Sequence, residues 1–362
     1  MHYDLLIVGN GFDLACNYKT SYVDFLDYEG RKGVSNPLIS FFLSAYNRNV
    51  VSNNEWNGFE SLLCQYLQFL DYLFNSKDNV ERHFTEPHYD AWGNPISRYY
   101  ELKICDVSKI PQNIYLVLML SNPLEKRLVI SPEADFRFPF TCIDDYEDIK
   151  EVGFRVFINS SIVNSTNEYV LKYLLKELDL RLNDLEKDLK QYIATATKGS
   201  LSGPPNIFDF EVDRVVSFNY SKTAQFLYEL DDTDIAYVHG DINTNIVVGV
   251  EQSMIDKQSF EEESDYMIFF KRFRRIFKDC NKGYNNKIIN RLNGDSTIGI
   301  YGHSLDLSDV SLLKPLFVKK YKRYDIYCYK SIEDYKIKLV NLLGLDLYDE
   351  LEKDGKINLV LI

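Results

Sequence analysis

The sequence lacks the cysteine spacings of zinc sites and of disulfide frameworks. Its six cysteines are scattered over 362 residues, at positions 16, 64, 105, 142, 280 and 328, and no two form a Cys-x-x-Cys pair. Closely spaced pairs are typical of structural zinc sites, and dense cysteine is typical of small secreted domains. Their absence argues against both classes and predicts reduced thiols and no bound metal.

Long apolar runs and a basic leader are also absent. No uncharged apolar run approaches the roughly 18 residues that a membrane-spanning helix needs. The first apolar run begins at Leu5 with no basic segment before it, so we expect no signal peptide. These absences predict a cytoplasmic protein without a membrane partner.

Basic residues are fewer than acidic residues. There are 41 Lys and Arg residues against 54 Asp and Glu residues, so the net charge is −13 and the pI is near 5.0. This balance opposes broad contact with nucleic acid. The one local basic run is KRFRR at residues 271–275, and such a run on a helix is usually a solvated face.

What the sequence does contain is material for a large α/β core. Short apolar runs predict strands, and they alternate with helical patterns in the second half of the chain. This alternation predicts a Rossmann-like parallel sheet with helices on both faces. The expected strands are residues 5–8, 212–218, 235–238, 245–250, 296–301 and 323–329, and the expected helices of this half are 265–279, one from Ser308 and Asp309, and 331–343.

A large, mostly helical insertion is expected after the first strand. Helical periodicity marks residues 37–46, 55–74 and 167–192. We expect the leucine stripe of residues 167–192 to pack on the sheet or on the helix at 55–74, with self-association as the alternative. Glu60, beside the apolar stripe of that helix, is expected to be solvated.

Six prolines between residues 87 and 139 predict an irregular stretch over residues 76–165, with strand-like runs at 114–120 and 152–158. A linker follows at residues 198–205. The predicted domains are therefore a nucleotide-binding core of residues 1–30 and 206–362, and an insertion of residues 31–205. The role of residues 76–165 does not follow from the sequence.

The turn Gly9-Asn10-Gly11 closes the first predicted strand. Its glycines either serve the geometry of a tight turn or let an anion approach the free N–H groups of a following helix. The full G-x-G-x-x-G fingerprint is absent because Leu14 stands at the third glycine position. No Gly-Lys-Ser/Thr follows a glycine-rich loop, which argues against a Walker-type phosphate site.

Polar residues follow four of the predicted strands: GNGFD at residues 9–13, SFNY at 217–220, HGD at 239–241 and GHS at 302–304. Ligands of parallel sheets bind at the carboxyl ends of the strands, so these groups should meet at one edge. Each also has a structural interpretation. Asn219 or Ser304 could cap a helix, and a lone histidine more often makes a structural hydrogen bond. Ser221 is expected to cap the helix that contains Thr223, Phe226 and Leu227.

The segments GNGFDL…KTSYVDFL, SFNYSKT, VHG and IYGHSLDLSD, in this order, resemble the AbiH family of bacterial phage abortive-infection proteins. WNGFE at residues 56–60 resembles the tryptophan-acidic helix of that family. The resemblance spans both ends of the chain, with the middle as the variable insertion. It implies defence against phage, set off by a phage-derived trigger.

A more distant resemblance is to sirtuin-like NAD-binding domains, which carry a GAG-type turn, a strand ending in asparagine and a strand ending in His-Gly. It implies that NAD is bound as substrate or ligand. Asn219 would hold the nicotinamide ribose or orient a water, and His239 would be the general base, since histidine titrates near neutral pH. The remaining cofactor-binding residues implied are Gly9, Asn10, Gly11, Phe12 and Gly240, with Gly302, His303 and Ser304 at the adenosine end.

The chain departs from the sirtuin pattern at Asn10 and at Phe12-Asp13, and it lacks the zinc-binding cysteines of deacetylating sirtuins. Protein deacetylation is therefore not expected. Asp13 is an added carboxylate that could act with Asn219 and His239 in catalysis, by bonding a ribose hydroxyl or by stabilising an oxocarbenium-like centre. Its plainer interpretation is a helix N-terminal charge.

Three functions stay open from the sequence. The first is hydrolysis of the N-glycosidic bond of NAD or a related nucleotide. The second is a non-catalytic sensor of a nucleotide or ADP-ribose that acts through a partner. The third is a metal-dependent nuclease in which Asp13, Asp241 and Asp309 hold Mg²⁺.

Overall fold

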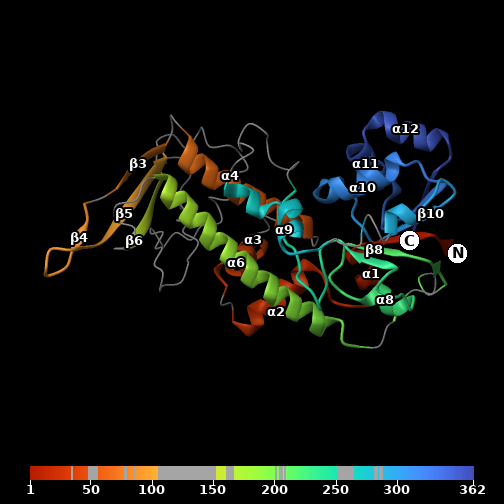
Figure 1. The fold of residues 1–362 in the computed structure, drawn as a ribbon, viewed down its shortest axis with the longest axis horizontal. Coiled ribbons are helices and arrows are strands. Elements are labelled where there is room, and N and C mark those ends of the chain that lie inside the picture. Colours follow the sequence, from red (N-terminus) through yellow and green to blue (C-terminus); the bar gives the residue numbers. More distant parts are fainter. Residues whose placement is uncertain are drawn as a thin grey trace.

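The computed structural model describes residues 1–33, 36–47, 56–76, 80–84, 86–104, 152–159, 167–199, 202–203, 207, 209–251, 265–280, 284 and 288–362. A parallel sheet lies at one end of the molecule, and a helical arm extends away from it (Figure 1). Both termini lie at the sheet end. No helix in these ranges is long and apolar enough to cross a membrane.

The main sheet has six strands, all parallel: β2 (Leu5–Val8), β8 (Val215–Ser217), β9 (Ile235–Tyr237), β10 (Thr297–Tyr301), β11 (Arg323–Cys328) and β12 (Ile357–Leu361). Numbered 1 to 6 along the chain, the strands lie in the order 3-2-1-4-5-6 across the sheet. This is the strand order of doubly wound dinucleotide-binding sheets, and the order reverses between β2 and β10. The predicted parallel α/β sheet is confirmed.

Helices cover both faces of the sheet, as the alternation predicts. Leu5 and Ile7 point to a core shared with α10 (Val310–Val318), α11 (Ile332–Leu343) and α12 (Leu345–Lys353). Leu6 and Val8 point to the other core, shared with α1 (Asn10–Ala15) and α8 (Thr223–Leu227). Side chains alternate between the two faces of a strand, and both faces here are covered, so all four residues are buried.

Two predicted strands differ from the structure. Residues 211–212 form a separate strand, β7 (Glu211–Val212), which pairs with β1 (His2–Tyr3) outside the main sheet. The strand expected at residues 245–250 is absent: this segment makes only an isolated bridge from Val250 to Phe270. Its alternating apolar side chains, Ile246, Val248 and Val250, pack into the helical core instead.

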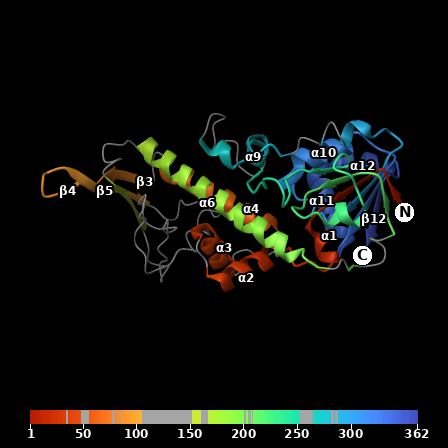
Figure 2. The same ribbon diagram turned by 60° about the horizontal axis from the view of Figure 1, so that its bottom comes forward.

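The arm consists of α2 (Tyr22–Lys32), α3 (Pro37–Asn47), α4 (Trp56–Asn75) and α6 (Asn167–Ala196), which run beside one another (Figure 2). The leucine stripe of α6 is buried against α4 and its neighbours, so the predicted packing on the helix at 55–74 is confirmed. The core of the arm also takes in Tyr22 and Phe25 and part of residues 246–270. The domain boundaries at residues 30 and 206 stay a prediction.

The far end of the arm is an antiparallel sheet of β3 (Val80–Phe84), β4 (His88–Tyr89), β5 (Pro95–Ile104) and β6 (Val152–Asn159). The irregular stretch predicted for residues 76–165 is therefore wrong where the structure describes it, because β5 pairs along its length with β3 and β6. The strand expected at 152–158 is confirmed, and the one at 114–120 lies outside the described residues.

Three short elements connect the arm to the sheet edge: η5 (Asp265–Phe269), α9 (Lys271–Phe277) and η8 (Leu307–Asp309), and η7 (Ile289–Arg291) precedes β10. In Figures 1 and 2, α9 lies between the arm and the strands. The basic helix predicted at residues 265–279 is thus divided into η5 and α9.

Candidate functional site

Asn219 and His239 follow neighbouring strands at the carboxyl edge of the sheet. Ser217 pairs with Tyr237 at the ends of β8 and β9, and each site residue comes two positions later. Both side chains are buried, with exposed fractions of 5% and 4%. The expectation that the strand ends meet at one edge is confirmed for this pair.

A carboxylate orients the His239 ring. Nε2 of His239 lies 2.9 Å from Oδ1 of Asp309. Burial would raise the pKa of Asp309, but Lys271 and His239 hold it well below its ordinary value, so the carboxylate is ionised and only accepts hydrogen bonds. Nε2 of His239 therefore donates the proton, and the lone pair is on Nδ1.

Nδ1 of His239 is buried and has no hydrogen-bond partner among the described residues. Burial lowers the pKa of His239 to about 4; Asp309 opposes this shift, and Lys271 and Arg275 add to it. The ring is therefore neutral at pH 7. An oriented neutral imidazole with a free nitrogen is the arrangement of a general base, although its low pKa weakens it as a base.

Asn219 offers a second unpartnered atom. Its Oδ1 is buried and accepts no hydrogen bond from the described residues, while its backbone N–H donates to Oγ of Ser217 at 3.1 Å. A buried acceptor without a donor is costly and rare, so it marks a place where a ligand or water would bind.

Asp13 joins this edge from α1. Oγ of Ser221 donates to its Oδ1 at 2.8 Å, and Thr223 donates to Ser221 at 3.0 Å. Burial raises the pKa of Asp13 to about 6, although hydrogen bonds from Ser221, Thr223 and Asn219 lower it. The predicted helix cap by Ser221 is wrong: Lys222 is the N-cap residue of α8, and the Ser221 hydroxyl donates to Asp13 instead.

Behind Asp309 lies a second buried ion pair. Nζ of Lys271 is 3.2 Å from Oδ1 of Asp309 and 2.6 Å from Oε1 of Glu60 on α4. The predictions that Glu60 is solvated and that the basic run at 271–275 is a solvated face are both wrong. Lys271, Arg274 and Arg275 are buried because acidic residues from α4, α6 and η8 surround α9.

The glycine turn packs against the chain itself. The Gly11 N–H donates to the Gly302 carbonyl at 2.8 Å. A Cβ atom at Gly9 would lie 2.6 Å from Gly302 O, and one at Gly11 would lie 2.7 Å from Gly302 Cα. Neither Gly9 nor Gly11 has a positive φ, whereas Gly302 does (+66°). The glycines therefore allow β2 and β10 to approach at the point where the strand order reverses.

The other predicted cofactor-binding residues are accounted for individually. Asn10 accepts a hydrogen bond from Thr20 at 2.8 Å, and Phe12 is buried beside Tyr301. Gly240 turns with φ +77° next to the Asn245 carbonyl. Nδ1 of His303 accepts the Leu305 N–H at 2.9 Å. Ser304 is half-buried. A ligand-binding role for these residues stays a prediction.

The carboxylates named for a metal are held in separate contacts. Asp13 bonds Ser221, Asp309 bonds His239 and Lys271, and Asp241 accepts the N–H groups of Asn243 and Thr244. Within the described ranges, no three His, Cys, Asp or Glu side chains form a group suited to a metal ion.

Sequence reasoning missed the contacts of Asp309, Lys271 and Glu60 around His239. Asp309 stands 70 positions after His239, and the sequence suggests it only as the start of a helix or as a metal ligand. A signal existed in the IYGHSLDLSD segment, which carries an aspartate beside a strand end, but no spacing rule connects it to residue 239.

A model of the family described as "Bacteriophage abortive infection AbiH" matches residues 5–329. No curated protein matches the chain. The family match includes the strand ends, the arm and the segment that holds Asp309. The chain therefore belongs to the AbiH family of bacteriophage abortive-infection proteins.

Proposed function

We propose that this protein is an abortive-infection effector that hydrolyses the N-glycosidic bond of NAD or a related nucleotide. Family membership supports the biological role. One observation carries the chemistry: Asn219 and His239, at adjacent strand ends, each bury an acceptor atom without a hydrogen-bond partner in the described structure. Such atoms are expected to bind substrate or an attacking water.

In the proposed reaction, a water attacks C1′ of the nicotinamide ribose. Its proton passes to Nδ1 of His239, and its oxygen forms the new bond to C1′. The C1′–N bond breaks, and nicotinamide leaves with the electron pair, which neutralises its pyridinium charge. Asp309 stabilises the imidazolium through Nε2, as carboxylates do in hydrolase triads.

Asn219 and Asp13 have supporting roles in this proposal. Oδ1 of Asn219 accepts a hydrogen bond from a ribose hydroxyl or from the water. Asp13 lies within reach of the Asn219 side chain, and its ionised form would stabilise positive charge at C1′. The Gly9–Gly11 turn gives less support, because the Gly11 N–H is engaged by Gly302. The proposal therefore rests on the ribose end of the nucleotide.

The test is the NAD content of cells during phage infection. We expect NAD to fall with the wild type and to stay level with Asn219→Ala and His239→Ala. His88→Ala is the matched control, because His88 is an exposed histidine on β4 in the arm, and NAD should fall as in the wild type. NAD loss of equal size with His239→Ala would overturn the proposal.

A second candidate is a sensor that binds a nucleotide or ADP-ribose without turnover. It is favoured by the low pKa of His239, which makes the ring a weak base in the structure described. In this case calorimetry detects ADP-ribose binding that Asn219→Ala removes, while NAD stays level in infected cells that still die. The integrity of cellular nucleic acid would then be measured next.

A further inference from the structure

Three of the four cations of helix α9 lie on the side that faces the rest of the protein, and the fourth, Arg272, is exposed. Lys271, Arg274 and Arg275 recur at helical spacing and are each at most 5% exposed. Their main contacts differ, although Arg275 also interacts with Asp309 and Glu60. Lys271 reaches the sheet edge, Arg274 reaches α6, and Arg275 lies beside Ser311 and Glu251. The helix therefore connects the arm to the candidate site.

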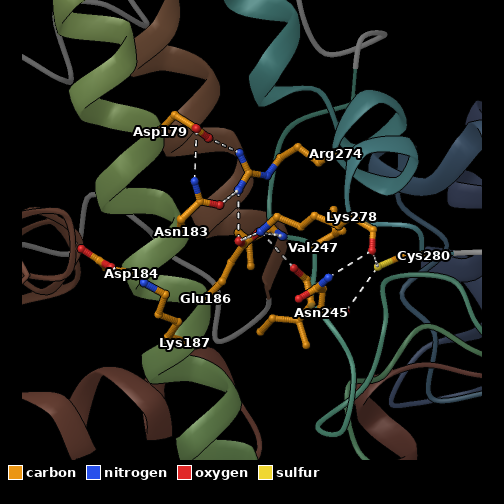
Figure 3. A network of polar contacts seen from close by, with 12 residues as sticks. Asp179, Asn183, Asp184, Glu186, Lys187, Asn245, Val247, Arg274, Lys278 and Cys280 are labelled. Carbon is orange, nitrogen blue, oxygen red and sulfur yellow. Dashed lines mark hydrogen bonds and ion pairs between the residues drawn. The ribbon is translucent and has the colours of Figure 1, made fainter.

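The contact with α6 is extensive (Figure 3). The Arg274 guanidinium donates to Asp179 at 2.6 Å, to Asn183 at 2.9 Å and to Glu186 at 3.0 Å. Glu186 also accepts hydrogen bonds from Lys278 and from the Val248 N–H. Arg274 thus fixes α9 on the arm, and the position of Lys271 depends on the position of the arm.

Lys271 and His239 share one oxygen of Asp309. Oδ1 lies 2.9 Å from Nε2 of His239 and 3.2 Å from Nζ of Lys271. Because Lys271 is buried and also bonds Glu60 at 2.6 Å, its charge is fixed at this oxygen and unscreened by water. A cation on the carboxylate reduces the stabilisation that Asp309 can give to a protonated His239.

We propose that Lys271 is an inhibitory counter-ion of the site: Glu60 holds it on Asp309, and moving α9 or α4 away from the sheet edge strengthens His239 as a base. The effect on catalysis rests on the proposed function, whereas the effect on His239 does not. We call the Glu60–Lys271–Asp309 contact a latch, because it would keep the effector inactive until a trigger acts. In the structure described, Asp13, Asn219 and His239 are all at most 5% exposed, as a closed site requires.

The charged groups that act on His239 come from three elements. Asp309 on η8 favours its protonated form, and Lys271 and Arg275 on α9 disfavour it. Glu60 on α4 acts through Lys271, and His303 lies 3.8 Å from the far oxygen of Asp309. Of these groups, Lys271 is the one cation that bonds the same oxygen as His239, so it is the one to remove.

The first measurement is the titration of His239 by NMR in the full-length protein with isotope-labelled histidine. The chain has 5 histidines, and His239→Ala assigns the signal. In Lys271→Met we expect the pKa of His239 to rise from about 4 by about 1 to 3, the range that a charge within about 4–6 Å produces.

Lys271→Met leaves Glu60 buried without its cation, which could prevent folding. The double variant Glu60→Gln/Lys271→Met removes both charges. It should raise the pKa of His239 by less than Lys271→Met does, because losing the Glu60 carboxylate partly offsets losing the Lys271 charge. Lys172→Met is the control, because Lys172 pairs with Glu168 at 2.7 Å on the exposed face of α6. It should leave the His239 pKa at its wild-type value. A His239 pKa that equals the wild-type value in the double variant overturns the proposal.

The second measurement separates the latch from the reaction. In uninfected cells, NAD loss with the double variant should exceed that of the wild type by at least roughly tenfold, and His239→Ala should abolish it. A raised His239 pKa with unchanged NAD supports the counter-ion and overturns NAD hydrolysis. An unchanged pKa with His239-dependent NAD loss in infected wild-type cells supports the hydrolysis and overturns the latch.

Discussion

Asp13 illustrates at the residue scale how burial changes the chemistry of a side chain. It is 1% exposed, and desolvation disfavours its charged form more than three hydrogen-bonding side chains favour it. The folded pKa of about 6 is therefore above the ordinary value of 3.8. The folded protein binds this proton more tightly than the unfolded chain, so Asp13 contributes stability at low pH that is lost as the pH rises through about 6.

Asp13→Asn should remove this pH dependence, because the amide cannot ionise and still accepts the Ser221 hydroxyl bond. Between about pH 4 and pH 7 the wild type should lose the contribution of Asp13. Its free energy of unfolding should therefore fall by roughly 2–3 kcal/mol relative to that of the variant. Urea unfolding of both proteins at the two pH values measures the difference. If the two proteins differ in stability by the same amount at both pH values, the pKa of Asp13 is not raised by folding.

At the scale of the element, α9 is a basic helix that is largely buried rather than solvated. A run of cations in an acidic protein is expected to be solvated, yet Arg274 is 3% exposed and Arg272 is exposed. The reason is the acidic stripe of α6, where Asp179 and Glu186 face α9 (Figure 3). The two acidic partners of Arg274 lie about 90 positions away in the chain, so no local pattern reveals them.

Arg274→Met should destabilise the protein by about 3–5 kcal/mol, because it leaves Asp179, Asn183 and Glu186 without their shared donor. Arg272 lies two positions before Arg274, on the exposed side of the same helix. Arg272→Met should change the stability by no more than about 0.5 kcal/mol. Denaturant unfolding of the two variants gives the comparison. Equal effects of the two substitutions would mean that the α6 contact contributes nothing.

For the whole molecule, the arm and the sheet have hydrophobic cores of their own, but chain segments cross between them. Residues 246–250 and 266–270 follow the sheet strand β9 and contribute side chains to the core of the arm, and α9 bonds both parts. Because separating the parts would expose this apolar surface and break buried ion pairs, we expect arm and sheet to unfold together.

Leu182→Ala tests this cooperativity, because Leu182 is fully buried in α6. The substitution should lower the stability by about 2–5 kcal/mol and speed amide hydrogen exchange in α6 and in β10 by the same factor. Leu180→Ala, on the exposed side of α6 (47%), is the control and should leave both rates nearly unchanged. Faster exchange in α6 alone would show that the arm unfolds independently of the sheet.

The fold class and most elements could be predicted from local patterns. Leu5–Val8 reads as a strand buried on both faces, and the leucine stripe of α6 reads as a packed helix; both are confirmed. Residues 245–250 misled the prediction because alternating apolar residues also suit an irregular segment that packs on helices. The family was identified from motifs at the strand ends, and the match to residues 5–329 confirms it.

The sequence by itself determined the parallel sheet, the helical insertion and the family, because hydrophobic periodicity and short motifs are local properties. It also predicted that Asn219 and His239 follow strands whose carboxyl ends lie at one edge of the sheet. Only the tertiary structure decided what surrounds them: the bond from His239 to Asp309, and the burial of Lys271 between Asp309 and Glu60. These contacts join residues 38 to about 210 positions apart. Opposite charges at such separations are brought together by packing rather than by spacing along the chain.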